Sequence, residues 1–280
     1  MIITMLFLQL RNELGKLFGK PRTYIGFGAL LLAQMIIVLV FRYSHASRGM
    51  VNQLESNGYD AADYLTSLTI ATVMLIPISY VLLPLYVCLI GGELVAKEAE
   101  DGTLRMILSR PITRFRLLLV KWLAGGIFAA LLVLLLGLLG AGFARLFFPW
   151  GGMFVPGETF NLLDAPEGLW HYAMAHLFLA VKAVTVLSLA FMFSCFNMKP
   201  AAATIMALSV TFVSFVLMQI PFFSDLQPWF FTYYLNLWQN LLLQPVPWWK
   251  VWQSLSVLVG FNLTFLIVGF TAFHMRDIKS

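Results

Sequence analysis

The chain has 280 residues, of which 60% are hydrophobic and 11% are charged. Soluble domains carry about 25% charged residues, so this composition excludes a soluble globular protein. A net charge of +5 is compatible with nucleic-acid binding, but the basic residues do not gather on one polar face, and we expect no nucleic-acid partner. The length allows six membrane spans with short loops and no sizeable domain outside the membrane, which predicts a single transmembrane domain over residues 1–280.

The N-terminal segment, residues 1–22, has the pattern of an amphipathic helix. Phe7, Leu10 and Leu14 share one helical face, while Lys16 and Lys20 lie opposite. The charges follow or interrupt the apolar run instead of preceding it, so the segment is not a signal peptide. We expect a helix that lies in the membrane interface.

Six apolar runs are long enough to cross a membrane. They are residues 23–41, 64–92, 122–144, a stretch within 169–198, 200–224 and 251–275. The second run contains Pro77 and Pro84, which predicts a kinked helix. Polar loops over residues 42–63 and 145–168 join the spans. The sequence therefore predicts an all-α polytopic membrane protein.

Residues 225–250 are apolar but interrupted. Three prolines divide the segment, and four tryptophans lie in it. Proline breaks helices, and tryptophan favours the membrane–water interface. We therefore expect interfacial or re-entrant helices on the outer side.

The charged segment, residues 93–121, lies between the second and third spans. It is too polar for hydrocarbon and must lie in water. Leu104, Ile107 and Leu108 fall on one helical face, Pro111 ends that helix, and Thr113 is a suitable N-cap for the next one. The pattern predicts a short amphipathic helix, a corner and a return into the membrane. The alternative interpretation is a solvated loop.

These residues resemble the signature of type-2 ABC transporter permeases. The matching residues are Glu93, Glu98, Gly102, Thr103, Leu104, Leu108, Ser109, Pro111, Arg114 and Lys121. The resemblance implies that residues 1–22 are the elbow helix and that the charged segment is a cytoplasmic coupling helix docking on a separate ATPase. The residues it implies for that contact are Glu98, Asp101, Gly102, Thr103, Leu104, Ile107, Leu108, Arg110, Pro111 and Arg114.

The resemblance also implies the composition of the complex. It predicts an exporter with two ATPase subunits and a second permease chain, which is either an identical copy or a relative. ATP and magnesium would bind to the ATPase, so this chain would hold no cofactor and would not be an enzyme.

Lys and Arg are distributed unevenly between the two sides of the predicted spans. With the N-terminus inside, 13 of the 18 basic residues lie on the inner side: Arg11, Lys16, Lys20, Arg22, Lys97, Arg105, Arg110, Arg114, Arg116, Lys121, Lys199, Arg276 and Lys279. The positive-inside rule then predicts a multi-pass protein of the cytoplasmic membrane with both termini in the cytoplasm.

Lys182 is the one charge inside a predicted span. A charge at the centre of a bilayer is costly, which favours a wet substrate path through this residue. The alternative is that Lys182 lies near the end of its span and extends outward to the interface. We identify no catalytic, cofactor-binding or metal residues: His171 and His176 are five positions apart and do not share a helical face.

Two other functions compete with an ABC permease. A secondary transporter driven by an ion gradient usually has several ionisable residues in its spans, and a membrane-embedded enzyme needs an acid–base pair. The spans here contain one ionisable side chain of this kind, which favours the permease and an apolar or amphipathic cargo.

Overall fold

The computed structural model describes residues 2–109, 112–156 and 160–276. Within them, six helices are long and apolar enough to cross a membrane, which confirms the predicted all-α polytopic class. They are α2 (Pro21–Tyr43), the continuous helix Ser67–Glu93, α9 (Arg114–Phe147), α10 (Ala165–Cys195), α11 (Pro200–Met218) and α14 (Trp248–Met275).

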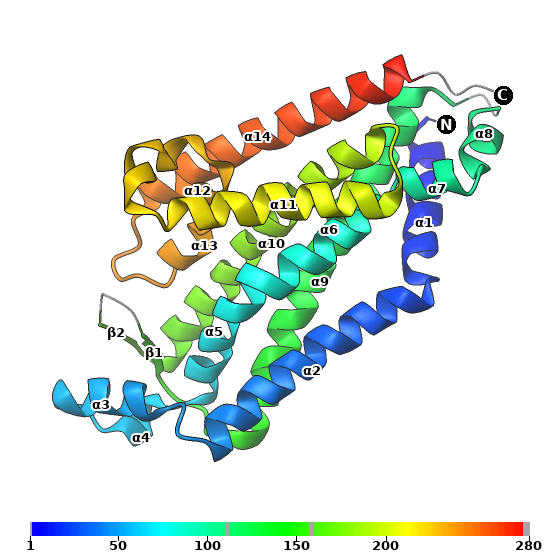
Figure 1. The fold of residues 1–280 in the computed structure, drawn as a ribbon. Helices are drawn as coiled ribbons and strands as arrows, with labels where there is room; N and C mark the ends of the chain where they lie inside the picture. The colour runs from blue at the N-terminus through cyan, green and yellow to red at the C-terminus, as the bar shows by residue number, and fades with distance from the viewer. Residues whose placement is uncertain (1, 110–111, 157–159, 277–280) are drawn as a thin grey trace.

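The spans run alternately up and down, so the bundle has two distinct ends (Figure 1). The charged end carries the beginning of α2, α9 and α11 together with α1 (Ile2–Phe18), α7 (Ala96–Glu100) and α8 (Thr103–Leu108). The opposite end is the tryptophan end. Seven of the eight tryptophans belong to it, Trp122 being the exception. Apolar burial centres on α10, which packs against α6, α9, α11 and α14.

The second span is irregular at its middle. It consists of α5 (Ser67–Pro77), a turn of π-helix η1 (Ile78–Leu82) and α6 (Leu83–Glu93). Pro77 and Pro84 flank or follow this turn, and proline donates no backbone N–H to a helix. The wider turn accommodates the broken hydrogen-bond pattern where the sequence predicts a kink.

Close helix contacts explain two glycines. A Cβ at Gly92 would lie 2.4 Å from Thr204 Oγ1, so glycine allows α6 to approach α11. A Cβ at Gly137 would lie 2.5 Å from a ring carbon of His176, so glycine makes room for the histidine ring between α9 and α10. Small residues at such crossings are typical of membrane helices.

The tryptophan end has more structure than the predicted loops. Residues 42–63 include α3 (Arg48–Ser56) and most of α4 (Ala61–Tyr64). A two-stranded antiparallel sheet, β1 (Met153–Val155) with β2 (Asn161–Leu163), places Met153 opposite Leu163. The Phe154 N–H donates to Thr69 Oγ1 at 2.9 Å, which fixes the hairpin on the second span.

Short helices occupy the segment predicted to be interfacial or re-entrant. They are the 3₁₀ helix η2 (Pro221–Trp229), α12 (Phe231–Tyr234) and α13 (Leu237–Asn240). Each is too short to cross a membrane. Trp238 is fully buried, so it belongs to the packed interior and not to an aromatic belt.

Candidate functional site

The charged segment forms two short helices joined at a glycine. α7 ends at Glu100, and Gly102 then adopts a φ of 71° before α8 begins. A positive φ favours glycine, which explains why this residue stands at the corner. Lys97 forms ion pairs with Glu100 and Asp101, both at 2.9 Å, so these carboxylates are engaged within the corner itself.

The apolar face of α8 is turned toward the protein. Leu104 is 2% exposed, and Ile107 and Leu108 are half-buried against the core. The expectation that all three form an exposed face for a partner is therefore wrong for Leu104. The physical reason is that the apolar face of an amphipathic helix can pack against the rest of the same chain and then needs no partner to cover it.

The exposed side of α8 presents different residues. Arg105, Met106 and Ser109 are exposed, and Met106 retains 65% of its surface. Asp101 and Gly102 continue this surface at the corner. Arg110 and Pro111 lie outside the described residues.

An ion-pair cluster, defined as Glu13, Lys16, Glu98 and Lys121, joins α1, α7 and α9. The Lys121 ammonium lies 2.8 Å from Glu13 Oε2 and 2.7 Å from Glu98 Oε1. Lys16 pairs with the same two carboxylates at 2.6 and 3.0 Å. Lys121 is 1% exposed, so its charge is compensated inside the protein and not by water.

The ion-pair cluster shifts the pKa of two of its members, Glu13 and Lys16. Burial opposes ionisation of Glu13, but Lys121 and Lys16 outweigh it and hold the pKa of the carboxyl below its ordinary value. Burial likewise opposes the charge on Lys16, and Glu13 with Glu98 raises its pKa. Glu13 and Lys16 therefore both remain charged near neutral pH.

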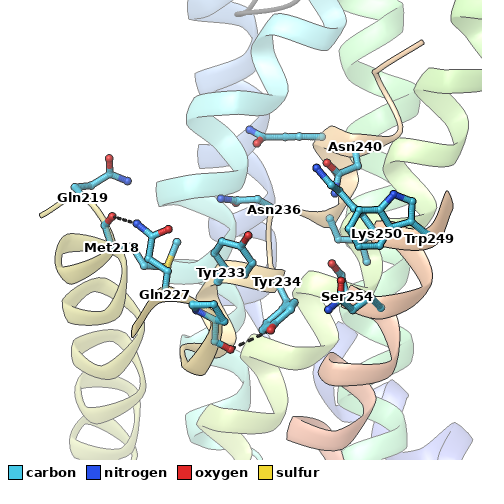
Figure 2. A pocket seen from close by; sticks show the side chains of 14 residues that line it. Met218, Gln219, Gln227, Tyr233, Tyr234, Asn236, Asn240, Trp249, Lys250 and Ser254 are labelled. Atoms are coloured by element: carbon cyan, nitrogen blue, oxygen red, sulfur yellow. Dashed lines mark hydrogen bonds between the residues drawn. The ribbon is translucent and has the colours of Figure 1, made fainter. Parts of the chain in front are cut away.

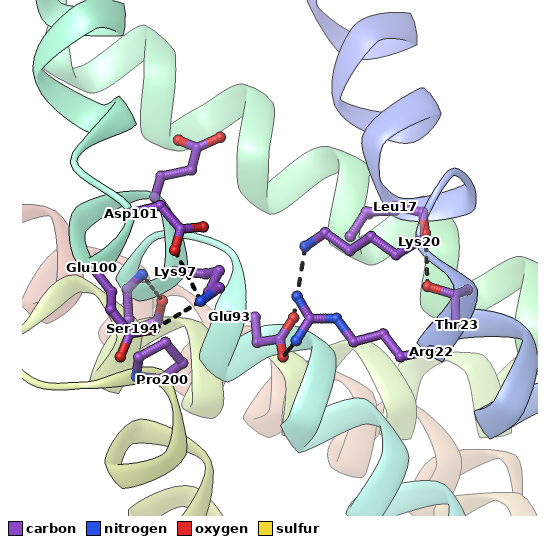
Figure 3. A network of polar contacts seen from close by, with 12 residues as sticks. Leu17, Lys20, Arg22, Thr23, Glu93, Lys97, Glu100, Asp101, Ser194 and Pro200 are labelled. Atoms are coloured by element: carbon purple, nitrogen blue, oxygen red, sulfur yellow. Dashed lines mark hydrogen bonds and ion pairs between the residues drawn. The ribbon is translucent and has the colours of Figure 1, made fainter.

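A second set of contacts ties α2 and α10 to the same region (Figure 3). Glu93, the last residue of α6, pairs with Lys20 at 3.6 Å and also with Arg22. On the other side, Ser194 Oγ accepts from the backbone N–H groups of Val95 and Ala96, both at 2.9 Å. The charged segment is thus held at its beginning by two spans besides its own.

Arg114 closes the end of the last span. Its guanidinium donates to the carbonyl oxygens of His274 at 2.9 Å and Arg276 at 3.2 Å. The last carbonyls of a helix lack partners within it, so Arg114 caps α14. Arg114 thus has a role within the chain, and its predicted contact with an ATPase stays a prediction.

A cavity of about 430 Å³ lies between α1 and the charged segment. Its charged lining includes all four residues of the ion-pair cluster, Glu93 and Lys97. Thr103 and Ile107, both predicted contact residues, also line it. The hollow shows that α8 rests against α1 without filling the space between them.

Lys182 does not adopt one of its two predicted settings, the one at the membrane interface. It is 1% exposed, so it does not extend outward to the interface. Its ammonium lies 4.7 Å from the ring centre of Tyr80 and 5.6 Å from that of Phe215, and it makes no hydrogen bond to a described residue. Its place on a substrate path stays a prediction.

The whole layout matches a known family. The family model described as ABC-2 family transporter protein matches residues 13–278, which include the second part of α1 and every later element described above. The chain belongs to the ABC-2 transporter family. An uncharacterized protein of Bacillus subtilis strain 168, YhcI, is 29% identical over 118 residues, which are 41% of this chain and 38% of YhcI. The aligned part thus spans well under half the length of this curated relative.

Family membership makes this ABC-2 chain a multi-pass membrane subunit of a transporter. The structure brings the predicted site residue Glu98 into an ion pair with Lys121. Lys121 is one of the residues that match the family signature, but the resemblance assigns it no role. Sequence reasoning missed Glu13. The sequence did contain a signal, because Glu13 is the one acidic residue in segment 11–22, where the other charged residues are basic.

Proposed function

We propose that this ABC-2 chain is the permease of an ATP-driven exporter and that α7 and α8 dock on a separate ABC ATPase in the cytoplasm. The observation that carries the proposal is the ion-pair cluster, because it connects α7 to the membrane span α9 through the buried Lys121, and α8 follows α7 directly at the Gly102 corner. A partner that moves the charged segment would then move α9 as well.

The docking surface we propose is the exposed side of the corner, made of Asp101, Gly102, Arg105, Met106 and Ser109. Met106 supplies apolar area that the chain itself leaves uncovered, and burial of one such side chain contributes ~1.5–3 kcal/mol. Arg105 and Asp101 would orient the contact more than strengthen it. ATP and magnesium bind to the partner in this scheme.

The transmission path has three steps. Motion of α8 reaches α7 through the Gly102 corner, and Glu98 of α7 passes it to Lys121 of α9. Glu13 passes part of the same motion to α1, which packs along α9. The ion pairs of the cluster are short and partly shielded from water, so we expect α1, α7 and α9 to move together.

The complete transporter, in this proposal, has two permease chains and two ATPases. The Lys and Arg asymmetry supports a cytoplasmic position for the charged end and for both termini. A cargo that is apolar or amphipathic is consistent with spans that contain a single buried lysine away from their ends.

Met106→Asp tests the docking surface. The full chain is co-expressed with candidate P-loop ATPases from the same genome, and co-purification and ATP turnover are measured in nanodiscs. We expect the variant to lose most of the bound ATPase while its thermal unfolding midpoint stays that of the parent, because Met106 makes few contacts within the chain.

Met275→Asp is the matched control. It places the same substitution on another exposed methionine at the same end, but on α14, where Met275 is 78% exposed. We expect it to retain the ATPase. The proposed docking surface is wrong if an ATPase binds the parent and Met106→Asp retains both that subunit and its turnover.

A further inference from the structure

A second cavity lies at the tryptophan end, away from the charged segment. Its volume is about 470 Å³, in the range of small-molecule sites. Figure 2 shows side chains converging on it from the end of α11, from α12 and α13, and from the first turns of α14. The short helices within residues 225–250 thus separate α11 from α14 and form part of the cavity wall between them.

The lining is polar and lacks acidic residues. Among the described residues that form the wall, none is Asp or Glu. Each of six carboxamides offers a donor and an acceptor. They are Gln219, Gln227, Asn236, Gln239, Asn240 and Gln253. This many amides around one hollow fits a ligand with several hydroxyl or ester oxygens.

Several of these groups have hydrogen-bonding capacity to spare. Asn236 Oδ1 is buried and makes no hydrogen bond with the described residues. Gln227 and Gln239 use their amide nitrogens on Met218 O and on Tyr80 Oη, which leaves their oxygens as acceptors. A buried polar atom without a partner is destabilising, so a ligand hydroxyl that donates to Asn236 Oδ1 would offset part of that cost.

Lys250 gives the cavity its charge. Its ammonium makes no ion pair with any described residue and lies 5.5 Å from the ring centre of Trp249, which also lines the cavity. An amine without a counter-ion beside an amide-rich hollow favours an anion. The ligand therefore combines one negative charge with neutral oxygen groups.

The surroundings identify the source of that ligand. Trp249 is 67% exposed, Trp252 and Tyr233 are exposed nearby, and such residues mark the level of lipid head groups. Val216 of α11 and Val259 of α14 are exposed on the flanking spans, where they offer apolar surface to acyl chains. We infer that this cavity binds the head group of an anionic glycerophospholipid, with Lys250 at the phosphate and the carboxamides at the glycerol and ester oxygens. The inference requires membrane insertion but not the proposed ATPase partner.

Lipid titration of the purified full chain tests this inference. Native mass spectrometry measures retention of phosphatidylglycerol and of phosphatidylcholine for the parent, for Lys250→Ala and for Asn236→Leu. We expect the parent to prefer phosphatidylglycerol and Lys250→Ala to lose that preference by about tenfold, because the variant loses the charged hydrogen-bond donor to the phosphate. Asn236→Leu should weaken both lipids, because it removes an oxygen contact and not the charge.

Lys199→Ala is the control, because it removes an exposed lysine at the opposite end of the bundle. We expect it to bind as the parent does. The inference is overturned if Lys250→Ala retains the full preference for phosphatidylglycerol, or if Lys199→Ala loses it equally. It is also overturned if free glycerol phosphate, and not the lipid, binds in a manner that depends on Lys250.

Discussion

Lys121 is the residue on which the charged end depends most. Its ammonium contacts two carboxylates from two other helices, Glu13 of α1 and Glu98 of α7. Removing one partner of a buried ion pair costs ~3–5 kcal/mol, mainly because the other charges remain without compensation. Here the carboxylates keep some contact with water and with Lys16, which reduces the loss.

We predict that Lys121→Met lowers the free energy of unfolding by less than that full cost but by more than 1 kcal/mol. The measurement is denaturation of the purified chain in detergent, with Lys199→Met as a control on an exposed lysine at the same end. Equal effects of the two substitutions would mean that the ion-pair cluster contributes nothing beyond surface charge.

The same substitution has a predictable pH dependence. Because the folded pKa of Glu13 lies below its ordinary value of 4.5, the cluster contributes its full stability above that pH and loses it as the pH falls through the folded pKa. The stability difference between the parent and Lys121→Met should be constant near neutral pH and shrink below pH 4.5. A difference that grows on acidification would contradict this assignment of charges.

At the scale of elements, α8 has one face that packs inside the chain and one face that is exposed. Leu104 lies inside, whereas Met106 lies outside two positions later. Leu104→Asp would place a carboxylate in an apolar contact, which removes ~1.5–3 kcal/mol of burial and adds the cost of an unpaired charge. Substitution of this leucine therefore tests the packing of α8 and not a partner's affinity.

We predict that Leu104→Asp lowers the thermal unfolding midpoint of the isolated chain, without any ATPase present, while Met106→Asp leaves it unchanged. The conservative variant Leu104→Met should fall close to the parent, since swaps that conserve volume cost little. A Leu104→Asp chain as stable as the parent would show that α8 is not held against the bundle.

Some elements follow from the sequence and others do not. The spans and the start of α9 at Thr113 are local: hydropathy sets the spans, and the Thr113 hydroxyl accepts from the Arg116 N–H at 3.3 Å as an N-cap should. The contact of Glu13 with Lys121 is not local, because 108 positions separate the two residues. Without a fold, nothing in the sequence pairs them. The burial of Leu104 could not be predicted for the same reason. Periodicity shows which residues share a helical face, but it does not show what packs against that face.

For the whole molecule, the two ends differ in chemistry as much as in shape. One end gathers ion pairs between helices, and the other gathers tryptophans, short helices and a hairpin. Such asymmetry fixes orientation in a membrane, because basic loops stay in the cytoplasm and aromatic residues occupy the interface. The two proposed sites, for an ATPase and for a lipid, consequently lie on opposite sides of the bilayer.

We predict that the charged end faces the cytoplasm. Ser109 and Ser56 are exposed at the charged and tryptophan ends respectively, while both native cysteines, Cys88 and Cys195, are buried and add little background. In intact cells, a membrane-impermeant maleimide should label Ser56→Cys at once and Ser109→Cys only after permeabilisation. Both variants replace one small exposed side chain by another, so neither should disturb insertion. Labelling of Ser109→Cys in intact cells would invert the topology, and an ATPase in the cytoplasm could then not reach α8.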